Sequence, residues 1–246
     1  MMAWWEALLL VIGGLFAGAI NTVAGGGSML TVPLLVLAGV PGNAANGSNR
    51  VGILTSNIAA VATFRRLGVD GLRHASRVVV PVVLGGLIGS FAIGRLLDDA
   101  AFERVFGLLM IPLVILSVRR PSNASGDRAW STTKVVIVFL LIGIYGGAFQ
   151  AGVGLVLLAA LTRSGFDLVM SNSIKVIVNT AVTVVALPVF ILSGDIAWAP
   201  ALVLAAGFVV GGWLGAQASF RGGEVLIRRV MVVAALGLAG RLIGIY

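Results

Sequence analysis

Cysteine is absent from this 246-residue chain, and histidine occurs once, as His74. These absences exclude disulfide frameworks, thiol chemistry, iron–sulfur clusters and any metal site built from several histidines. Charged residues are also scarce: they make up 11% of the chain, whereas soluble domains carry about 25%. Hydrophobic residues account for 59%, which is more apolar surface than a soluble fold of this length can bury. The composition therefore predicts an integral membrane protein, and we expect no cofactor.

The apolar segments have the length of transmembrane helices, about 20 residues, and lack the polar alternation of barrel strands. Two segments, about 6–38 and about 133–162, are too long for one crossing and too short for two. Each is interrupted in its middle, by NTVAGGGS at 21–28 and by QAGVG at 150–154. We expect both to be broken, re-entrant hairpins of two short half-helices. Single helices are expected at about 44–64, 75–97, 101–118, 168–193, 197–219 and 225–245.

The distribution of basic residues predicts the topology, because cytoplasmic loops of membrane proteins carry an excess of Lys and Arg. The stretches 65–77, 119–134 and 221–229 are rich in Arg and Lys and are placed inside, whereas the loops at 98–99 and 194–195 are placed outside. Each long segment must then return to the side from which it entered. We expect a multi-pass protein of the cell (inner) membrane with both termini outside. Cytoplasmic anchoring also explains the net charge of +8, so no nucleic-acid partner is expected.

This predicted topology divides the chain into two repeats of opposite orientation. The first repeat covers 1–120, a cytoplasmic linker covers 121–131, and the second repeat covers 132–246. Matching residues recur at a constant separation, as in Gly39 with Gly165 and Gly68 with Gly194. The predicted fold is all-α, with two inverted repeats that each contain a hairpin followed by three transmembrane helices. Such repeats with broken helices are typical of secondary transporters.

Several motifs resemble those of the sulfite exporter TauE/SafE family, also called the TSUP membrane transporter family. They are GLFAGAINTVAGGGSMLTVPLLVLAG, NGSNRVGILTSNIAAVATFRRLG, GIYGGAFQAGVGLVLLAALTRSGFD, NSIKVIVNTAV and FVVGGWLGAQ, and together they cover nearly the whole chain. The resemblance implies a transporter of small sulfur anions such as sulfite, sulfonates or sulfoacetate. The second hairpin has GVG where the first has GGG, so the two tips need not be equivalent.

Polar residues inside the apolar segments form the candidate substrate site. Glycine-rich breaks free backbone N–H groups, and the short helix that follows presents its positive end to an anion. Arg50 and Lys175 are cations within predicted spans and are therefore functional candidates. The alternatives are tight helix packing for the glycines and snorkelling to the interface for the cations. We hypothesise an anion held between the two tips and Lys175, with Arg50 at the outer approach. The candidate substrate-binding residues are Asn21, Gly25, Gly26, Gly27, Ser28, Asn46, Asn49, Arg50, Gln150, Gly152, Gly154, Asn172, Lys175 and Asn179.

No Asp or Glu lies deep in a predicted span, so a proton relay of buried carboxylates is not supported. No nucleophile has an evident base, and we therefore expect no enzyme activity. The interpretation that we favour is a secondary transporter that exports a small sulfur-containing anion, sulfite or an organosulfonate, across the lipid bilayer. An anion channel and a non-transporting subunit of a membrane complex are the alternatives. The sequence leaves open whether the chain forms a homo-oligomer.

Overall fold

The computed structural model describes residues 4–118 and 130–221, and all the regular secondary structure in these ranges is helical, which confirms the predicted all-α class. The predicted last helix at 225–245 and most of the linker 121–131 lie outside the described residues. The helices are α1 (Trp4–Val23), α2 (Ser28–Leu37), α3 (Gly42–Arg66), α4 (Leu72–Leu96), α5 (Asp99–Val118), α6 (Thr132–Ala148), α7 (Val153–Arg163), α8 (Leu168–Leu192) and α9 (Trp198–Phe220).

Among the described residues, four helices are long and apolar enough to cross a membrane: α1, α4, α8 and α9. Helices α2, α6 and α7 are apolar but shorter. Large hydrophobic side chains stand exposed on the outside of the bundle, for example Leu84, Ile88 and Phe91 of α4. Because lipid tails solvate such surfaces, this pattern fits a multi-pass membrane protein.

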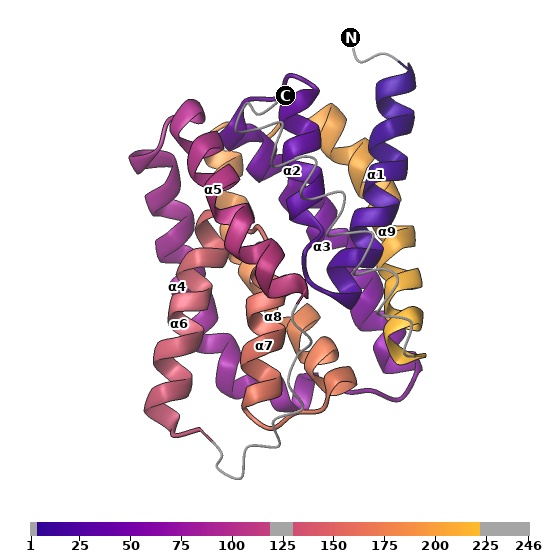
Figure 1. The fold of residues 1–246 in the computed structure, drawn as a ribbon, viewed down its shortest axis with the longest axis vertical. Helices are drawn as coiled ribbons and strands as arrows, with labels where there is room; N and C mark the ends of the chain where they lie inside the picture. Colours follow the sequence, from indigo (N-terminus) through magenta and orange to yellow (C-terminus); the bar gives the residue numbers. More distant parts are fainter. Residues whose placement is uncertain (1–3, 119–129, 222–246) are drawn as a thin grey trace.

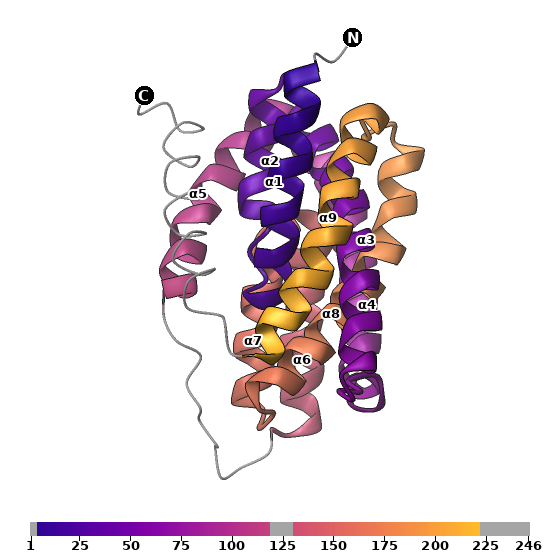
Figure 2. The same cartoon turned by 90° about the vertical axis from the view of Figure 1, so that its right-hand side faces the viewer.

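The two predicted hairpins are present. Helices α1 and α2 form the first, and α6 and α7 form the second. In Figure 1, α1 descends from the top of the molecule and α6 rises from the bottom, so the two hairpins point in opposite directions and their tips lie near its middle; Figure 2 shows the same arrangement from the side. The entering helices are longer than the expected half-helices, with 20 residues in α1 and 17 in α6, against 10 in α2 and 11 in α7.

Glycines allow these long entering helices to pack closely against helices of the other half of the chain. A Cβ placed on Gly18 of α1 would lie 2.7 Å from the carbonyl oxygen of Phe208 in α9. One placed on Gly85 of α4 would lie 2.7 Å from the backbone nitrogen of Ile144 in α6. Helix α1 therefore lies along α9, and α6 lies along α4. Each hairpin is held by a helix far from it in sequence.

The helix bounds recur along the chain. Helices α3 and α8 both contain 25 residues, and α8 begins 126 residues after α3, at Leu168 against Gly42. Helix α9 begins 126 residues after α4, at Trp198 against Leu72. This spacing supports the division into two repeats, which stays a prediction.

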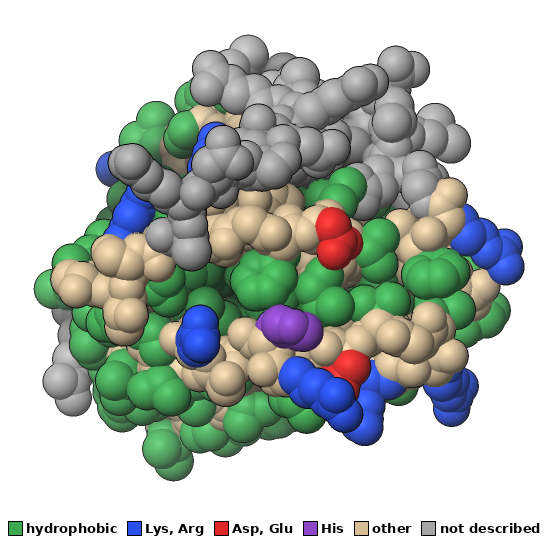
Figure 3. All heavy atoms as spheres, turned by 90° about the horizontal axis from the view of Figure 1, so that it is seen from below, with side chains coloured by type: hydrophobic (Ala, Val, Ile, Leu, Met, Phe, Trp, Pro, Cys, Tyr) green, Lys and Arg blue, Asp and Glu red, His purple; other side chains and the backbone are tan. Residues whose placement is uncertain are grey.

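The lower end of the molecule carries exposed basic side chains, as the view from below in Figure 3 shows around His74, the purple side chain. The turn between α3 and α4, the start of α6 and the end of α7 all lie at this end. These are segments that the sequence places in the cytoplasm, so the charge pattern supports that placement. The exposed cations of these segments are Arg65, Arg66, Arg73, Arg77, Lys134, Arg163 and Arg221.

Candidate functional site

The two hairpin tips touch each other inside the molecule. A Cβ placed on Gly25 would overlap the backbone of Gly154 and lie 2.5 Å from the nitrogen of Leu155, and one on Gly154 would overlap the Cα of Gly25. Gly25 also has a φ of +83°, which side-chain-bearing residues rarely adopt. The glycines of the two motifs are therefore needed both for backbone conformation and for the close approach of the tips.

The backbone of the first tip leaves hydrogen-bond donors free. The N–H groups of Ala24 and Gly25 donate to Ile20 O over 2.8 and 3.0 Å and close the end of α1. Among the described residues, the N–H groups of Gly26, Gly27 and Ser28 donate to no backbone or side-chain acceptor. These groups precede or begin α2, where a helix presents its positive end. These free donors leave the first tip as a candidate anion site, which stays a prediction.

The second tip is built on a strained residue. Gln150 has a φ of 58°, and among the described residues no other non-glycine residue has a positive φ. Its side chain is buried and fully engaged: Oε1 accepts from Arg50 over 2.9 Å, and Nε2 donates to Asn179 Oδ1 over 2.9 Å and to Thr183 Oγ1 over 3.5 Å. Strain of this kind persists only where the surrounding structure fixes it, and it concentrates at functional sites.

Arg50 closes the end of α6. Its Nη1 donates to Gly146 O over 3.2 Å, and its Nη2 donates to Gly147 O over 2.5 Å and to Ala148 O over 3.4 Å. The guanidinium carbon lies 4.4 Å from the ring centroid of Phe190. Arg50 is completely buried, so it does not snorkel to the surface of the described chain. Its positive charge offsets the negative end of α6.

Lys175 makes the corresponding contact with α1. Its Nζ donates to Asn21 O over 3.1 Å, to Thr22 O over 2.6 Å and to Asn172 Oδ1 over 2.7 Å. The residue is 1% exposed, and it too stays inside. Helices α3 and α8 therefore each supply a cation that stabilises the carbonyl end of a hairpin helix: Arg50 of α3 on α6, and Lys175 of α8 on α1.

The amide side chains extend the hydrogen-bond networks around these two cations. Asn21 Nδ2 donates to Asn57 Oδ1 over 3.1 Å, Asn46 Nδ2 donates to Ala148 O over 2.7 Å, and Asn172 Nδ2 donates to Ser219 Oγ over 2.8 Å. Asn49 Oδ1 accepts from the hydroxyl of Thr31 on α2. All the predicted site residues are buried, and they gather around the two tips in two networks, one centred on Arg50 and one on Lys175.

Sequence reasoning missed five side chains of these networks: Thr31, Asn57, Thr183, Phe190 and Ser219. A signal for Asn57 is present, because it follows Arg50 by seven residues and so lies on the same face of α3. Thr183 follows Asn179 by four residues in the same way. Nothing in the sequence marks Phe190 as a partner of Arg50.

Acidic groups are kept away from this interior. Among the described residues no Asp or Glu is buried, and the ion pair found there, Arg73 with Asp70 at 3.5 Å, lies at the surface. In the same part of the chain, no group of three His, Asp or Glu side chains could hold a metal. The tips thus combine cations and neutral donors without carboxylates, which suits an anion rather than a cation.

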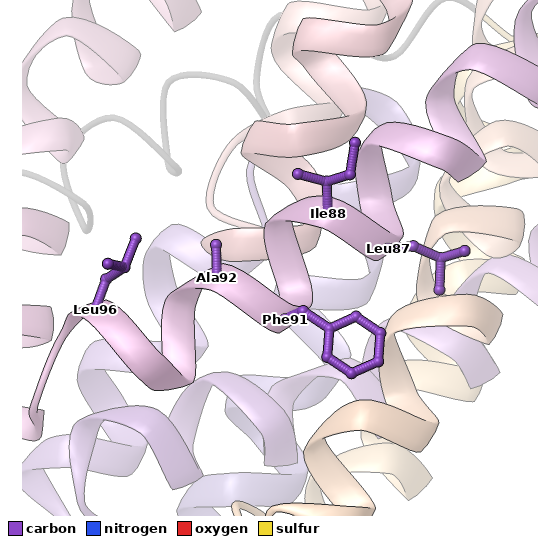
Figure 4. A pocket seen from close by; sticks show the side chains of 5 residues that line it. All are labelled: Leu87, Ile88, Phe91, Ala92 and Leu96. Carbon is purple, nitrogen blue, oxygen red and sulfur yellow. The ribbon is translucent and has the colours of Figure 1, made fainter.

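A hollow on the outer face of α4 differs chemically from the hairpin tips. It has a volume of about 520 Å³ and is lined by Leu87, Ile88, Phe91, Ala92 and Leu96, whose side chains are shown in Figure 4. None of these side chains can hydrogen-bond or pair with an anion. This surface suits a lipid tail, and the hairpin tips remain the candidate substrate site.

Several proteins named as membrane transporters are similar to this chain over most of its length. A "Probable membrane transporter protein" of Haemophilus influenzae is 27% identical over 234 residues, 94% of this chain and 91% of its own. "Probable membrane transporter protein ORF9" of Sinorhizobium sp is 25% identical over 238 residues, with 95% and 91% covered. "Probable membrane transporter protein YfcA" of Escherichia coli K12 is 26% identical over 243 residues, with 95% and 90% covered.

No solved structure matches the chain. A model of the family described as "Sulfite exporter TauE/SafE" matches residues 10–242. That range includes both hairpin tips and both buried cations. The match confirms the resemblance that the sequence motifs indicate. The chain therefore belongs to the sulfite exporter TauE/SafE family of membrane transporters.

Proposed function

We propose that the protein is a secondary transporter that exports a small sulfur-containing anion, sulfite or an organosulfonate, across the inner membrane. The observation that carries this proposal is the meeting of two glycine-rich tips, Gly25 against Gly154, in the interior of an apolar molecule. Two buried cations, Arg50 and Lys175, flank the tips. Burying positive charge in such an interior is costly, and cations in that position are typical of a pathway for an anionic substrate.

The anion binds where the tips meet. The free N–H groups at the start of α2 bind its oxygens, and the positive ends of α2 and α7 favour its charge. The carbonyl ends of α1 and α6 would repel it. Arg50 and Lys175 offset this repulsion through their bonds to those carbonyls, so the cations act on the substrate largely through the hairpins that they hold.

The opposed hairpins supply a route for alternating access. Because the tips touch, the arrangement is closed between Gly25 and Gly154. The first hairpin reaches the contact from the upper end of the molecule and the second from the lower end. Movement of one hairpin at a time would open the site to one side and then to the other, as in other carriers with inverted repeats.

Membrane potential is the driving force that fits this interior. The described part of the chain has no buried carboxylate to carry protons. A potential that is negative inside drives an anion outward by about 2.3 kcal/mol per charge per 100 mV. For a sulfonate of fixed charge, flux should follow an imposed potential and respond little to an imposed pH gradient. Strict dependence on a pH gradient would contradict this coupling.

Transport by the purified protein in proteoliposomes tests the proposal. We expect uptake of sulfite or an organosulfonate that saturates with concentration, measured against a panel of sulfite, sulfate, sulfoacetate and taurine. The variant Gly26→Leu, which places a bulky side chain at the buried first tip, should abolish it. Single-channel currents proportional to voltage would instead identify an anion channel. Absence of any flux from folded protein would indicate a subunit role.

A further inference from the structure

Two buried amide nitrogens on α3 have no hydrogen-bond partner: Asn49 Nδ2 and Asn57 Nδ2. Both residues are completely buried. The oxygen of each amide is engaged, in Asn49 by the hydroxyl of Thr31 and in Asn57 by Asn21 Nδ2 over 3.1 Å. A buried donor that lacks an acceptor is costly. An unpartnered pair of them therefore points to a ligand.

Both amides are connected to the first hairpin tip at Gly27. The hydroxyl of Thr31 contacts both Asn49 Oδ1 and Gly27 O, the latter over 3.3 Å. On the other side, a Cβ on Gly27 would lie 2.8 Å from Asn21 Cβ, and Asn21 donates to Asn57. One residue thus separates Gly27 from each amide. Both unpartnered nitrogens thus belong to side chains that are linked to the first tip, where the N–H groups of Gly26, Gly27 and Ser28 are free.

The donors at this tip that have no partner are all neutral. Arg50 directs its Nη donors to the carbonyls at the end of α6 and to Gln150, both at the second hairpin, and its buried Nε has no partner. Lys175 donates to carbonyls at the end of α1. Substrate bound beside α2 therefore meets amide N–H groups, with the cations set behind them.

Neutral donors favour a low charge on the substrate. The cost of moving an ion out of water rises with the square of its charge in the Born description, and it is several kcal/mol per ion even for single charges. The gain from a fixed set of neutral hydrogen-bond donors rises only in proportion to the charge. Doubling the charge therefore costs more than these donors return.

We infer that this tip selects singly charged sulfur oxyanions, either hydrogen sulfite or a sulfonate R–SO₃⁻, over dianions such as sulfate and fully deprotonated sulfite. Asn49 Nδ2, Asn57 Nδ2 and the N–H groups of Gly26, Gly27 and Ser28 hold the three oxygens. This inference rests on the proposed function and adds the charge state and the donor residues to it.

Thermal stabilisation of the purified, unmodified protein tests the charge selectivity without any variant. Methanesulfonate, a fixed monoanion, should raise Tm equally across the neutral pH range, and sulfate at matched ionic strength should not. Stabilisation by sulfite should fall as pH rises and hydrogen sulfite loses its proton. Equal stabilisation by sulfate and methanesulfonate, or a sulfite effect that grows with pH, would overturn the inference.

Variants assign the donors. Asn49→Ala and Asn57→Ala should each weaken methanesulfonate binding about tenfold, since each removes one hydrogen bond to a charged group. Asn57→Asp should weaken it further, because a carboxylate then faces the anion. Asn43→Ala is the matched control on the same helix, since Asn43 Nδ2 donates to Leu97 O near the outer end; its affinity should match the parent. Unchanged affinity in both Asn49→Ala and Asn57→Ala would overturn the assignment.

Flux in proteoliposomes separates this inference from the proposed function. Transport of sulfate in preference to methanesulfonate would agree with the proposed function but overturn the inferred selectivity for single charge. Absence of both stabilisation and flux for all three anions would overturn both.

Discussion

The ammonium nitrogen of Lys175 lies 2.6 Å from the carbonyl oxygen of Thr22, a residue 153 positions earlier in the chain. The contact joins α8 to the end of α1, where backbone carbonyls have no partner within the helix. Arg50 Nη2 makes the equivalent contact with Gly147 O at the end of α6 over 2.5 Å. Both hairpin tips are therefore held in place by cations on the 25-residue helices α3 and α8.

We expect Lys175→Ala to lower the thermal stability of the substrate-free protein and to abolish transport. The substitution leaves the buried carbonyls of Asn21 and Thr22 without this donor, at about 1–3 kcal/mol for each unsatisfied group. The measurement is Tm in detergent together with flux in proteoliposomes. Lys134→Ala is the control, because Lys134 is exposed and lies over Trp130; its change should stay within about 0.5 kcal/mol. Full stability of Lys175→Ala with lost binding would instead make Lys175 a direct ligand of the anion.

Gly25→Ala should prevent the tips from meeting. Its Cβ would overlap the backbone of Gly154, which cannot move aside as a side chain could. Gly39→Ala separates this effect from backbone strain, because Gly39 has a φ of +82° but no atom within 4 Å of its Cβ position. We expect a loss of about 1–2 kcal/mol for Gly39→Ala and a much larger loss of stability and flux for Gly25→Ala. Equal effects would show that the tips can separate freely.

Two substitutions of Gln150 separate the cost of its backbone strain from the loss of its side-chain hydrogen bonds. Both Gln150→Ala and Gln150→Gly remove the contacts with Arg50 and Asn179, and both should reduce transport. Only glycine relieves the positive φ of 58°, so we expect Gln150→Gly to be more stable than Gln150→Ala by about 1–2 kcal/mol. Thermal unfolding of the pair checks this. Equal stability would mean that the second tip is not held in the left-handed conformation.

Asp195, in the loop between α8 and α9, should make stability depend on pH. Partial burial, together with the negative charge of Asp99, raises the pKa of Asp195 above its usual range. The folded state therefore favours the protonated form of the Asp195 carboxyl. The stability that this form provides is lost as pH rises through the raised pKa. Asp195→Asn should therefore gain Tm over the parent as pH rises through mild acid, with no gain below the usual aspartate range.

Asp99→Asn provides a check on the second cause of that shift. It removes the neighbouring charge while its side-chain oxygen can still accept the N–H of Asn43, as Asp99 Oδ1 does over 2.8 Å. The pH dependence that arises from Asp195 should become smaller. An unchanged profile of Tm against pH in both variants would contradict the assigned cause.

The predicted topology can be tested with single cysteines, since the parent has none. Gly68 and Gly194 are a matched pair: both have a positive φ, +80° and +76°, and no atom lies within 4 Å of either Cβ position. Gly194→Cys should react with an impermeant thiol reagent added outside, and Gly68→Cys only after the cytoplasmic side is opened. Labelling of both from one side would contradict the opposed hairpins.

The sequence by itself determined the class of protein and the places where its helices break. NTVAGGGS and QAGVG predict interruptions, and in the structure α1 ends at Val23, α2 begins at Ser28, α6 ends at Ala148 and α7 begins at Val153. These features are local, because glycine-rich breaks and apolar run lengths act through the backbone of the segment itself. The same local signals gave the candidate residues of the tips.

Only the tertiary structure decided what those residues contact. The sequence places Arg50 and Lys175 within predicted spans but cannot distinguish an anion ligand, a snorkelling side chain and a helix-end donor, because the backbone carbonyls that they contact are 96 or more positions away. Asn49 and Asn57 become candidate donors only once α3 is packed against the first hairpin and their oxygens are engaged. Hydrogen bonding and burial depend on which surfaces meet, and in this chain that is settled by the crossed packing of α1 on α9 and of α6 on α4.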